Sequence, residues 1–299
     1  MSGVQGYKVF DITLTRKEML TPSLMCCVFG GEAIREMKMG APDQRIKLLF
    51  PSEDGTPSRL PTEGEWYRLA QQLPKAQRPI PRTYTMRRLD TEKGEMAVEF
   101  VIHGTEGPAS SWAMTAQPGA EVQAVAPNGA FPDDCGGYEW VLPPRVTQVM
   151  LAADETALPA VKGILEQLAE RAEPPRVQAF IEVPLAADCV DLSQFAFAEV
   201  FWLPRADTGA SYGERLLAAV RQSAQLPEAV SSSGLDVQDI PDDEVLWERA
   251  QVQQGEFFGW IAAESSSVKN LRRYLLGERG IAREAVTFMA YWSRGARSH

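Results

Sequence analysis

The secondary-structure pattern of the sequence changes at Val141-Leu142-Pro143-Pro144-Arg145, and this change limits which folds the chain can adopt. Paired prolines interrupt regular structure, because proline has no backbone donor and restricts the residue before it. Before this point, short alternating runs are broken by glycine and proline, as in antiparallel β-structure. After it, apolar runs alternate with amphipathic stretches, which is typical of parallel βα units. We therefore predict two domains, residues 1–143 and 144–299.

The first domain is predicted to be a small six-stranded antiparallel barrel. Its strands are expected at residues 7–15, 24–29, 45–50, 82–89, 96–103 and 121–126, with residues 51–78 as an insertion. The second domain is predicted to be α/β, with a parallel sheet of doubly wound type. Its strands are expected at 146–152, 177–183, 199–203, 244–248 and 286–291, and its helices at 157–171, 212–222 and 267–278.

Composition indicates a soluble globular protein, with 44% hydrophobic and 23% charged residues in 299. No basic and apolar leader opens the chain, and no window approaches the roughly 18 apolar residues of a membrane span. We therefore expect a cytoplasmic protein, monomeric and without a membrane partner. A net charge of −10 disfavours nucleic acid as a partner. Four cysteines without C-x-x-C spacing and two histidines give little support to a protein-held metal.

The stretch Arg82-Thr83-Tyr84-Thr85 is a candidate cofactor-binding strand. Residues two apart lie on the same side of a strand, so a guanidinium and an aromatic ring can reach one ligand at two points. A flavin dinucleotide suits this pair. Arg82 can bind a phosphate, Tyr84 can lie against the flavin or ribityl portion, and the Thr85 hydroxyl can donate to a ring nitrogen.

A second segment adds a phosphate site. Val98, Phe100 and Ile102 alternate with polar or exposed positions, and this strand pattern stops at Gly104. Gly107-Pro108 then begins a short helix, because proline is preorganised for the first helical position. The free amides at that helix start, with the hydroxyls of Ser110 and Ser111 nearby, suit a pyrophosphate. A pyrophosphate favours FAD over FMN as the cofactor.

In order and spacing, these motifs resemble those of the siderophore-interacting protein family. The shared motifs are R-T-Y-T from Arg82, a strand ending in H-G, the G-P-A-S-S-W-A run from Gly107, Ala126-Pro127-Asn128-Gly129, the stretch from Ala153 to Pro159, Leu271-Arg272-Arg273 and Tyr291-Trp292-Ser293-Arg294-Gly295. The resemblance covers roughly the whole chain. It implies an FAD-binding barrel followed by a ferredoxin-reductase-like domain that binds NAD(P)H. The predicted cofactor-binding residues are Arg82, Tyr84, Thr85, Glu99, Val101, His103, Gly107, Pro108, Ala109, Ser110, Ser111 and Trp112.

Asp154, Glu155 and Thr156 follow the first strand of the second domain, at its carboxyl end. Ligands of open α/β sheets bind at such ends, and the resemblance suggests that this end faces a nicotinamide nucleotide. The alternative is an ordinary helix start, with Thr156 as its cap and acidic residues favoured by the helix dipole. No G-x-G-x-x-G is present, and no arginine stands beside the two acids in the sequence.

Four residues are candidates for binding the substrate. The resemblance places Lys47 in a basic cluster that attracts an anionic ferric siderophore, although lysines on strand edges are also common without a function. Asn128 stands where the family often has arginine, which puts the full basic cluster in doubt. Lys269 and Arg272 share one helix face, and a solvated basic face is the alternative reading.

The resemblance implies a ferric-siderophore reductase, in which FAD passes electrons from NAD(P)H or a reduced ferredoxin to chelated Fe(III). No catalytic side chain is required, because the flavin carries the redox chemistry. Two other functions stay open at this point: a general flavin reductase or ferredoxin-NADP reductase, and a binding protein for ferric siderophores that has no catalytic activity.

Overall fold

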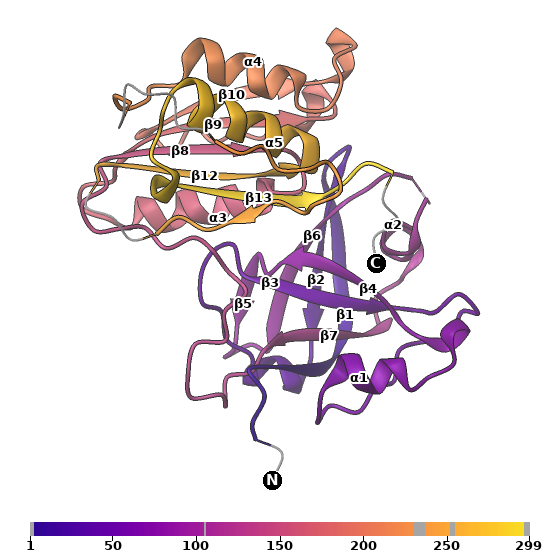
Figure 1. Cartoon of the computed structure of the whole chain (residues 1–299). Helices are drawn as coiled ribbons and strands as arrows, with labels where there is room; N and C mark the ends of the chain where they lie inside the picture. The colour runs from indigo at the N-terminus through magenta and orange to yellow at the C-terminus, as the bar shows by residue number, and fades with distance from the viewer. Residues whose placement is uncertain (1–2, 105, 230–236, 252–254, 296–299) are drawn as a thin grey trace. The chain divides into compact units, whose positions relative to one another are not determined.

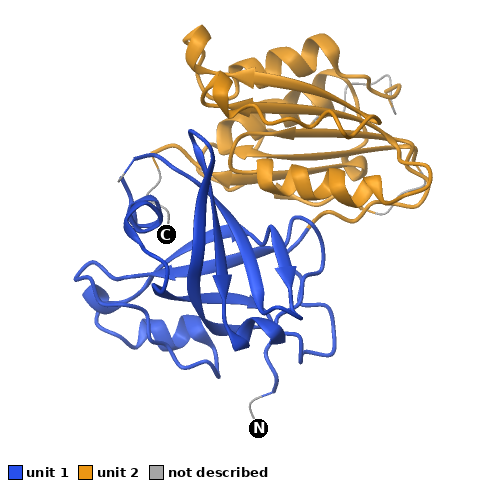
Figure 2. Ribbon diagram, turned by 180° about the vertical axis from the view of Figure 1, so that it is seen from behind, with its two compact units in different colours: residues 1–138, 299 blue, residues 139–298 orange. Residues whose placement is uncertain are grey.

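The computed structural model describes residues 3–104, 106–229, 237–251 and 255–295 (Figure 1). The chain divides into two compact units, residues 1–138 with 299 and residues 139–298 (Figure 2). The predicted domain boundary, between residues 143 and 144, falls a few residues after this division. Each unit contains one β-sheet with its own set of helices, and each is described separately below.

The first unit is built on a curled antiparallel sheet with the strand order β4-β3-β7-β1-β2-β6-β5. Its strands are β1 Tyr7–Thr21, β2 Leu24–Gly30, β3 Arg45–Phe50, β4 Ile80–Thr85, β5 Arg88–Asp90, β6 Glu95–Val101 and β7 Glu121–Pro127. Alternate residues of these strands point inward and form one apolar core that includes Phe10, Leu14, Phe29, Leu48 and Phe100.

The prediction of six strands was wrong in one respect, because the expected strand at residues 82–89 is two strands. The amide of Met86 donates to Gln44 O at 2.7 Å, whereas the next amide, of Arg87, donates to Ala97 O at 2.9 Å. Between these two residues the chain leaves β3 and joins β6. Since β4 and β5 are the two edges of the sheet, this crossing brings the edges together and curls the sheet into a half-barrel.

Two helices cover parts of the first sheet. Helix α1, Trp66–Gln71, lies in the insertion and contributes Leu69 and Ala70 to a small second apolar cluster with Val9 and Val125. Helix α2, Pro108–Thr115, follows β6 and packs Trp112 and Ala113 against the main core. The segment with the predicted phosphate site is thus attached to the same core as β4.

The second unit contains a mixed sheet with the strand order β10-β9-β8-β12-β13-β11. Its strands are β8 Gln148–Ala153, β9 Arg176–Val183, β10 Ala198–Pro204, β11 Trp247–Glu248, β12 Phe257–Glu264 and β13 Val286–Trp292. Five strands run parallel, but β11 pairs antiparallel with β13, so the predicted purely parallel sheet was wrong at this edge. The sequence also gave no expectation of β12, which lies inside the sheet.

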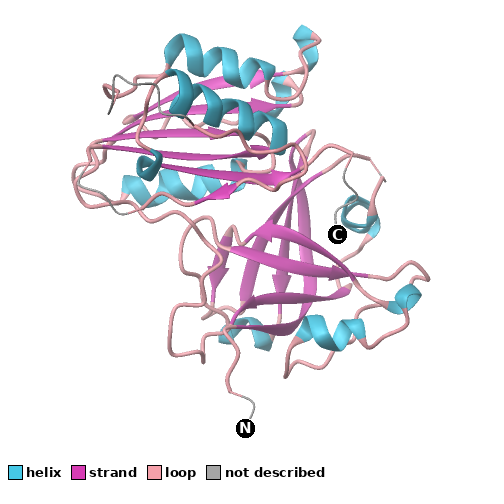
Figure 3. Ribbon diagram, viewed as in Figure 1, coloured by secondary structure: helices cyan, strands magenta, loops and turns pink. Residues whose placement is uncertain are grey.

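Three α-helices cover this second sheet, α3 Leu158–Ala169, α4 Glu214–Ser223 and α5 Ser265–Arg272, and α5 continues as a π-helix over Arg273–Glu278. Figure 3 shows α3 on one face, with α4 and α5 on the other. Strands β8 and β12 are buried along almost their whole length, as expected for parallel strands covered on both faces. Their carboxyl ends meet at one edge of the sheet.

Candidate functional site

The predicted cofactor strand, β4, is an edge strand whose two faces carry different groups. Arg82 and Tyr84 pair in register with Leu48 and Ile46, both fully buried, so they share the core side of the sheet. Thr85 points to the opposite side. Arg82 and Tyr84 are partly exposed, whereas Thr85 is buried.

Arg82 is half-buried, and within the described residues one hydrogen bond of its guanidinium leaves its other donors for a ligand. The hydrogen bond described for its guanidinium goes to Pro81 O at 2.9 Å. Burial lowers the pKa of Arg82, and the neighbouring Tyr84 opposes this shift; since arginine titrates far above neutral pH, the group stays charged. An arginine held this way can bind a phosphate through two parallel hydrogen bonds.

Tyr84 is held in an aromatic cluster. Its ring lies edge-on to Phe100, with centroids 4.5 Å apart, and 6.4 Å from Phe50. Burial raises the pKa of Tyr84, so the phenol is neutral at physiological pH. Trp112 joins the same cluster through Phe50 at 5.7 Å and Phe100 at 6.4 Å. The cluster therefore connects the cofactor strand with helix α2.

The loop before α2 is held by Ser110. Its Oγ accepts a hydrogen bond from the amide of His103 at 3.1 Å and donates one to Gly104 O. Its hydroxyl therefore fastens the loop, whereas the prediction placed it beside the pyrophosphate. Gly107 precedes the helix with a φ of 80°, which favours glycine, and no side chain caps this helix end. The first-turn amides have no helical partners and suit a phosphate ligand.

The other predicted cofactor residues differ from one another in burial and in their contacts. Glu99 is buried and forms an ion pair of 2.9 Å with Arg87, which is also buried. Val101, Pro108, Ala109 and Ser111 are partly exposed, and His103 and Gly107 are exposed. The structure thus gives Glu99 a partner within the chain, and Arg87 is a residue of this region that the sequence interpretation missed.

The four predicted substrate residues have different surroundings, with Lys47 and Asn128 in the first unit and Lys269 and Arg272 in the second. Lys47 is partly exposed, and its ammonium donates to Thr83 Oγ1 at 2.9 Å. Lys269 is buried and donates to Pro241 O and Asp242 O at 2.7 and 3.2 Å. Arg272 is buried and pairs with Glu248 at 2.9 Å. Lys269 and Arg272 thus form contacts that hold residues 238–248, in place of the solvated helix face that was the alternative reading, and Lys47 is the most accessible cation of the three.

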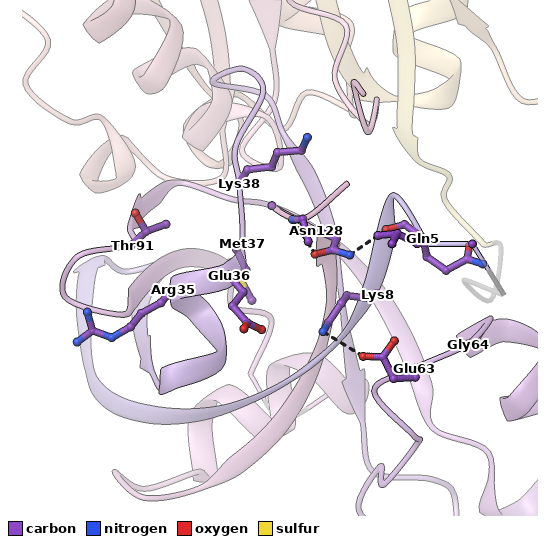
Figure 4. A pocket seen from close by; sticks show the side chains of 14 residues that line it. Gln5, Lys8, Arg35, Glu36, Met37, Lys38, Glu63, Gly64, Thr91 and Asn128 are labelled. Atoms are coloured by element: carbon purple, nitrogen blue, oxygen red, sulfur yellow. Dashed lines mark hydrogen bonds and ion pairs between the residues drawn. The ribbon is translucent and has the colours of Figure 1, made fainter. Parts of the chain in front are cut away.

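Asn128 lies on the wall of a cavity of about 710 Å³ in the first unit (Figure 4). Its amide donates to Gln5 O at 3.1 Å, and its Oδ1 accepts from the amide of Ala130 at 3.1 Å. Lys8, on the same wall, pairs with Glu63 at 3.6 Å. Asn128 therefore fastens the loop after β7, and its side-chain groups are already used in this structure.

At the carboxyl end of β8, Asp154 is fully enclosed by donors. Oδ1 accepts from the amide and hydroxyl of Thr156, and Oδ2 accepts from the amide of Glu264 at 2.9 Å and from Trp292 Nε1 at 2.8 Å. Burial, with a smaller effect of Glu155, raises the pKa of Asp154 to about 7. Asp154 thus ties together the ends of β8, β12 and β13.

Glu155 is paired with an arginine that lies far from it in the sequence. Arg205, just after β10, donates to both carboxylate oxygens of Glu155 at 2.6 and 3.0 Å, and lies 3.8 Å from Glu182. Burial raises the pKa of Glu182 to about 7. Arg205 also lies 4.3 Å from the ring centroid of Tyr212. Although no arginine stands beside the two acids in the sequence, the end of β10 brings Arg205 to Glu155.

Two further observations concern other classes of site. Within the described ranges, no helix is both long and apolar enough to cross a membrane. The described residues also include no group of three or more His, Cys, Asp or Glu side chains suited to hold a metal ion.

An antiparallel half-barrel followed by an α/β unit is a ferredoxin-reductase-like fold. A ferredoxin reductase of carbazole 1,9a-dioxygenase shares the fold, with a TM-score of 0.58 and 14% identity over 96% of this chain and 70% of that one. The sequence pattern of the siderophore-interacting FAD-binding domain matches residues 13–131, and that of the siderophore-interacting protein matches residues 146–295. The chain belongs to the siderophore-interacting protein family, and its cofactor is FAD.

Three relatives show the extent of the similarity. Protein Rv2895c of Mycobacterium tuberculosis is 32% identical, over 96% of this chain and 90% of that protein. The NADPH-dependent ferric-chelate reductase of Escherichia coli is 28% identical, over 94% and 92% of the two chains. The crystal structure of a siderophore utilization protein from T. fusca has a TM-score of 0.71 and 28% identity, over 98% of this chain and 96% of that one.

Proposed function

We propose that this protein is a ferric-siderophore reductase that uses FAD to pass electrons from NAD(P)H or a reduced ferredoxin to chelated Fe(III). The family supports this proposal, as do the similar proteins of Escherichia coli and Vibrio cholerae, which are named ferric-chelate reductase and ferric vibriobactin reductase. Fe(III) is bound far more tightly than Fe(II) by oxygen-rich chelators, so reduction releases the metal. The iron is therefore the substrate.

The observation that carries the proposal is the combination of Arg82, Tyr84 and the uncapped start of α2 around one aromatic cluster. FAD, when bound, can accept a hydride from NAD(P)H or single electrons from a ferredoxin and can release electrons singly, which is what reduction of Fe(III) requires. Arg82 and the α2 amides would hold the pyrophosphate. Tyr84, neutral and fixed by Phe100, would pack against the flavin portion, and the Thr85 hydroxyl would donate to the ring.

The remaining site assignments belong to the same proposal. We assign Lys47 to siderophore binding, since its ammonium is partly exposed, and the strand ends around Asp154 to the nicotinamide donor. We place the flavin domain in residues 1–143 and the donor domain in 144–299, a division supported by the two family matches. A cytoplasmic location and a monomeric state complete the proposal, and gel filtration with light scattering tests the latter.

The decisive experiment combines flavin content with iron reduction. Protein purified with FAD should be yellow, and under anaerobic conditions one donor among NADH, NADPH and reduced ferredoxin should bleach the flavin and then reduce a ferric siderophore. Arg82→Ala should bind FAD about ten- to a hundredfold more weakly, because a charge-assisted phosphate contact is lost. A colourless protein that binds ferric siderophores would instead indicate a non-catalytic binding protein.

A further inference from the structure

Helix α2 is fastened at its far end by a lysine to which no function has been assigned above. The Nζ of Lys17 donates to the carbonyl oxygens of Ala113 and Met114 at 3.0 and 3.1 Å, in the last turn of the helix. We infer that Lys17 is a positioning residue for FAD, which holds the C-terminus of α2 so that the N-terminus meets the pyrophosphate. This inference rests on the proposed flavin site.

The contact matches what a helix end requires. The last four carbonyls of an α-helix have no partners within the helix, and a cation there also interacts favourably with the helix dipole. Helix α2 has only eight residues, so its last turn is half of its length. Such a short helix is marginal alone, and its direction depends on contacts with the rest of the protein.

The strand register explains how Lys17 reaches α2. Lys17 pairs across β1 and β2 with Cys27, which is fully buried, so its side chain leaves the sheet on the core side. A lysine directed to that side requires polar partners, because an ammonium without them is costly to bury. The two helix carbonyls supply them from 96 and 97 residues away in the sequence. Among the described residues, no carboxylate forms an ion pair with Lys17.

The other contacts of α2 leave the direction of the helix axis to be held by Lys17. Trp112 stacks on Phe29 with centroids 6.0 Å apart and fixes how deeply the helix packs. Ser110 holds the preceding loop to the first turn. At the opposite end Ala113 packs in the core, and Lys17 is the polar side-chain contact described there, so its removal should let the axis tilt. A tilt should move the first-turn amides more than Trp112, which lies near the middle of the helix, and should leave Tyr84 and Phe100 on their strands in place.

Ligand binding to the apoprotein separates positioning from general stability. Dissociation constants for FAD and riboflavin would be measured by fluorescence quenching in wild type, Lys17→Met, Lys17→Gln and Lys17→Arg, with urea unfolding in parallel. Arg16→Met is the matched control, since Arg16 is the exposed neighbour and pairs with Glu95 at 3.2 Å. We expect Lys17→Met to weaken FAD binding about tenfold, which is the affinity lost when one charge-assisted contact is removed. Riboflavin binding should not change. Lys17→Arg should restore most of the affinity.

The outcomes distinguish this inference from the flavin site itself. If Lys17→Met or, should it not fold, Lys17→Gln binds FAD as wild type does, Lys17 does not position the helix. Equal weakening for FAD and riboflavin would likewise overturn the inference, because it indicates a general loss of structure. If wild-type apoprotein binds no FAD, or Arg82→Ala binds it unchanged, the proposed flavin site fails instead.

Discussion

Arg87 and Glu99 form a buried ion pair at the seam of the half-barrel. Arg87 is the residue at which the chain passes from β3 to β6, and Glu99 is on β6, so the pair joins the crossing to the strand that it enters. The sequence interpretation placed Glu99 among the cofactor residues. A carboxylate paired with arginine at 2.9 Å contributes more directly to holding the seam.

Removing one partner of this pair should be worse than removing both. We expect Glu99→Leu to lower the free energy of unfolding by about 3–5 kcal/mol, because it removes a carboxylate that pairs with the buried Arg87 guanidinium at 2.9 Å. The double variant Arg87→Met with Glu99→Leu should recover much of this loss. Urea unfolding of the three proteins tests this, and a double variant less stable than Glu99→Leu would contradict it.

Lys47 is the residue on which the substrate half of the proposal depends. Burial, with a smaller effect of Arg45, lowers the pKa of Lys47. Among the described residues, no carboxylate forms an ion pair with this ammonium. We expect Lys47→Ala to raise the KM for an anionic ferric siderophore while the rate of flavin reduction by the donor stays unchanged, since only substrate binding is lost. Thr83→Val is the matched control, because it removes the hydroxyl partner but keeps the charge. Wild-type kinetics in Lys47→Ala would place the docking site elsewhere.

Among the elements, the carboxyl edge of the second sheet concentrates buried acids. Asp154 and Glu182 have pKa values raised to about 7, chiefly by burial, from ordinary values near 4. In the pH range between these values the folded protein holds protons that the unfolded chain has released. Stability should therefore fall as pH rises from about 4 to 7 and then level off.

This pH dependence can be isolated by substitution. We expect the unfolding free energy of wild type, relative to Glu182→Gln, to decrease as pH rises from 4 to 7, because only wild type loses that proton. Glu199→Gln, at an exposed position on β10, serves as the control. Tryptophan fluorescence is a suitable probe, since the indole of Trp292 donates to Asp154. A difference that stays constant over this range would show that Glu182 titrates normally.

At the scale of the whole molecule, the net charge of −10 acts against an anionic substrate. Repulsion at long range slows encounter, and it is screened as the Debye length falls from about 30 Å at 0.01 M salt to about 8 Å at 0.15 M. We expect kcat/KM for an anionic ferric siderophore to rise over this range, whereas that for a neutral ferric chelate should not. A fall with salt would mean that local cations dominate the encounter.

Much of the architecture follows from local pattern. Strand alternation and helix periodicity in residues 7–126 and 146–291 predict a β unit followed by an α/β unit, because side-chain direction repeats with the backbone geometry itself. The R-T-Y-T stretch and the Gly107-Pro108 helix start are likewise local, and they indicate an FAD protein. Strand β12 was not predicted. It lies inside the sheet, where Gly259 packs so closely against Val286 that an added Cβ would lie 3.0 Å from the valine side chain.

Only the tertiary structure decided which distant side chains contact one another at the edges of the sheets. The sequence by itself determined the two classes of domain and supplied the motifs that predict a cofactor strand and a phosphate-binding helix, all of which depend on residues close together in the chain. It could not show that Arg205 pairs with Glu155, that Lys269 and Arg272 hold a loop, or that Lys17 reaches α2. Those contacts join residues 24 to 97 positions apart, and burial and pairing of charges depend on which distant segments the fold brings together.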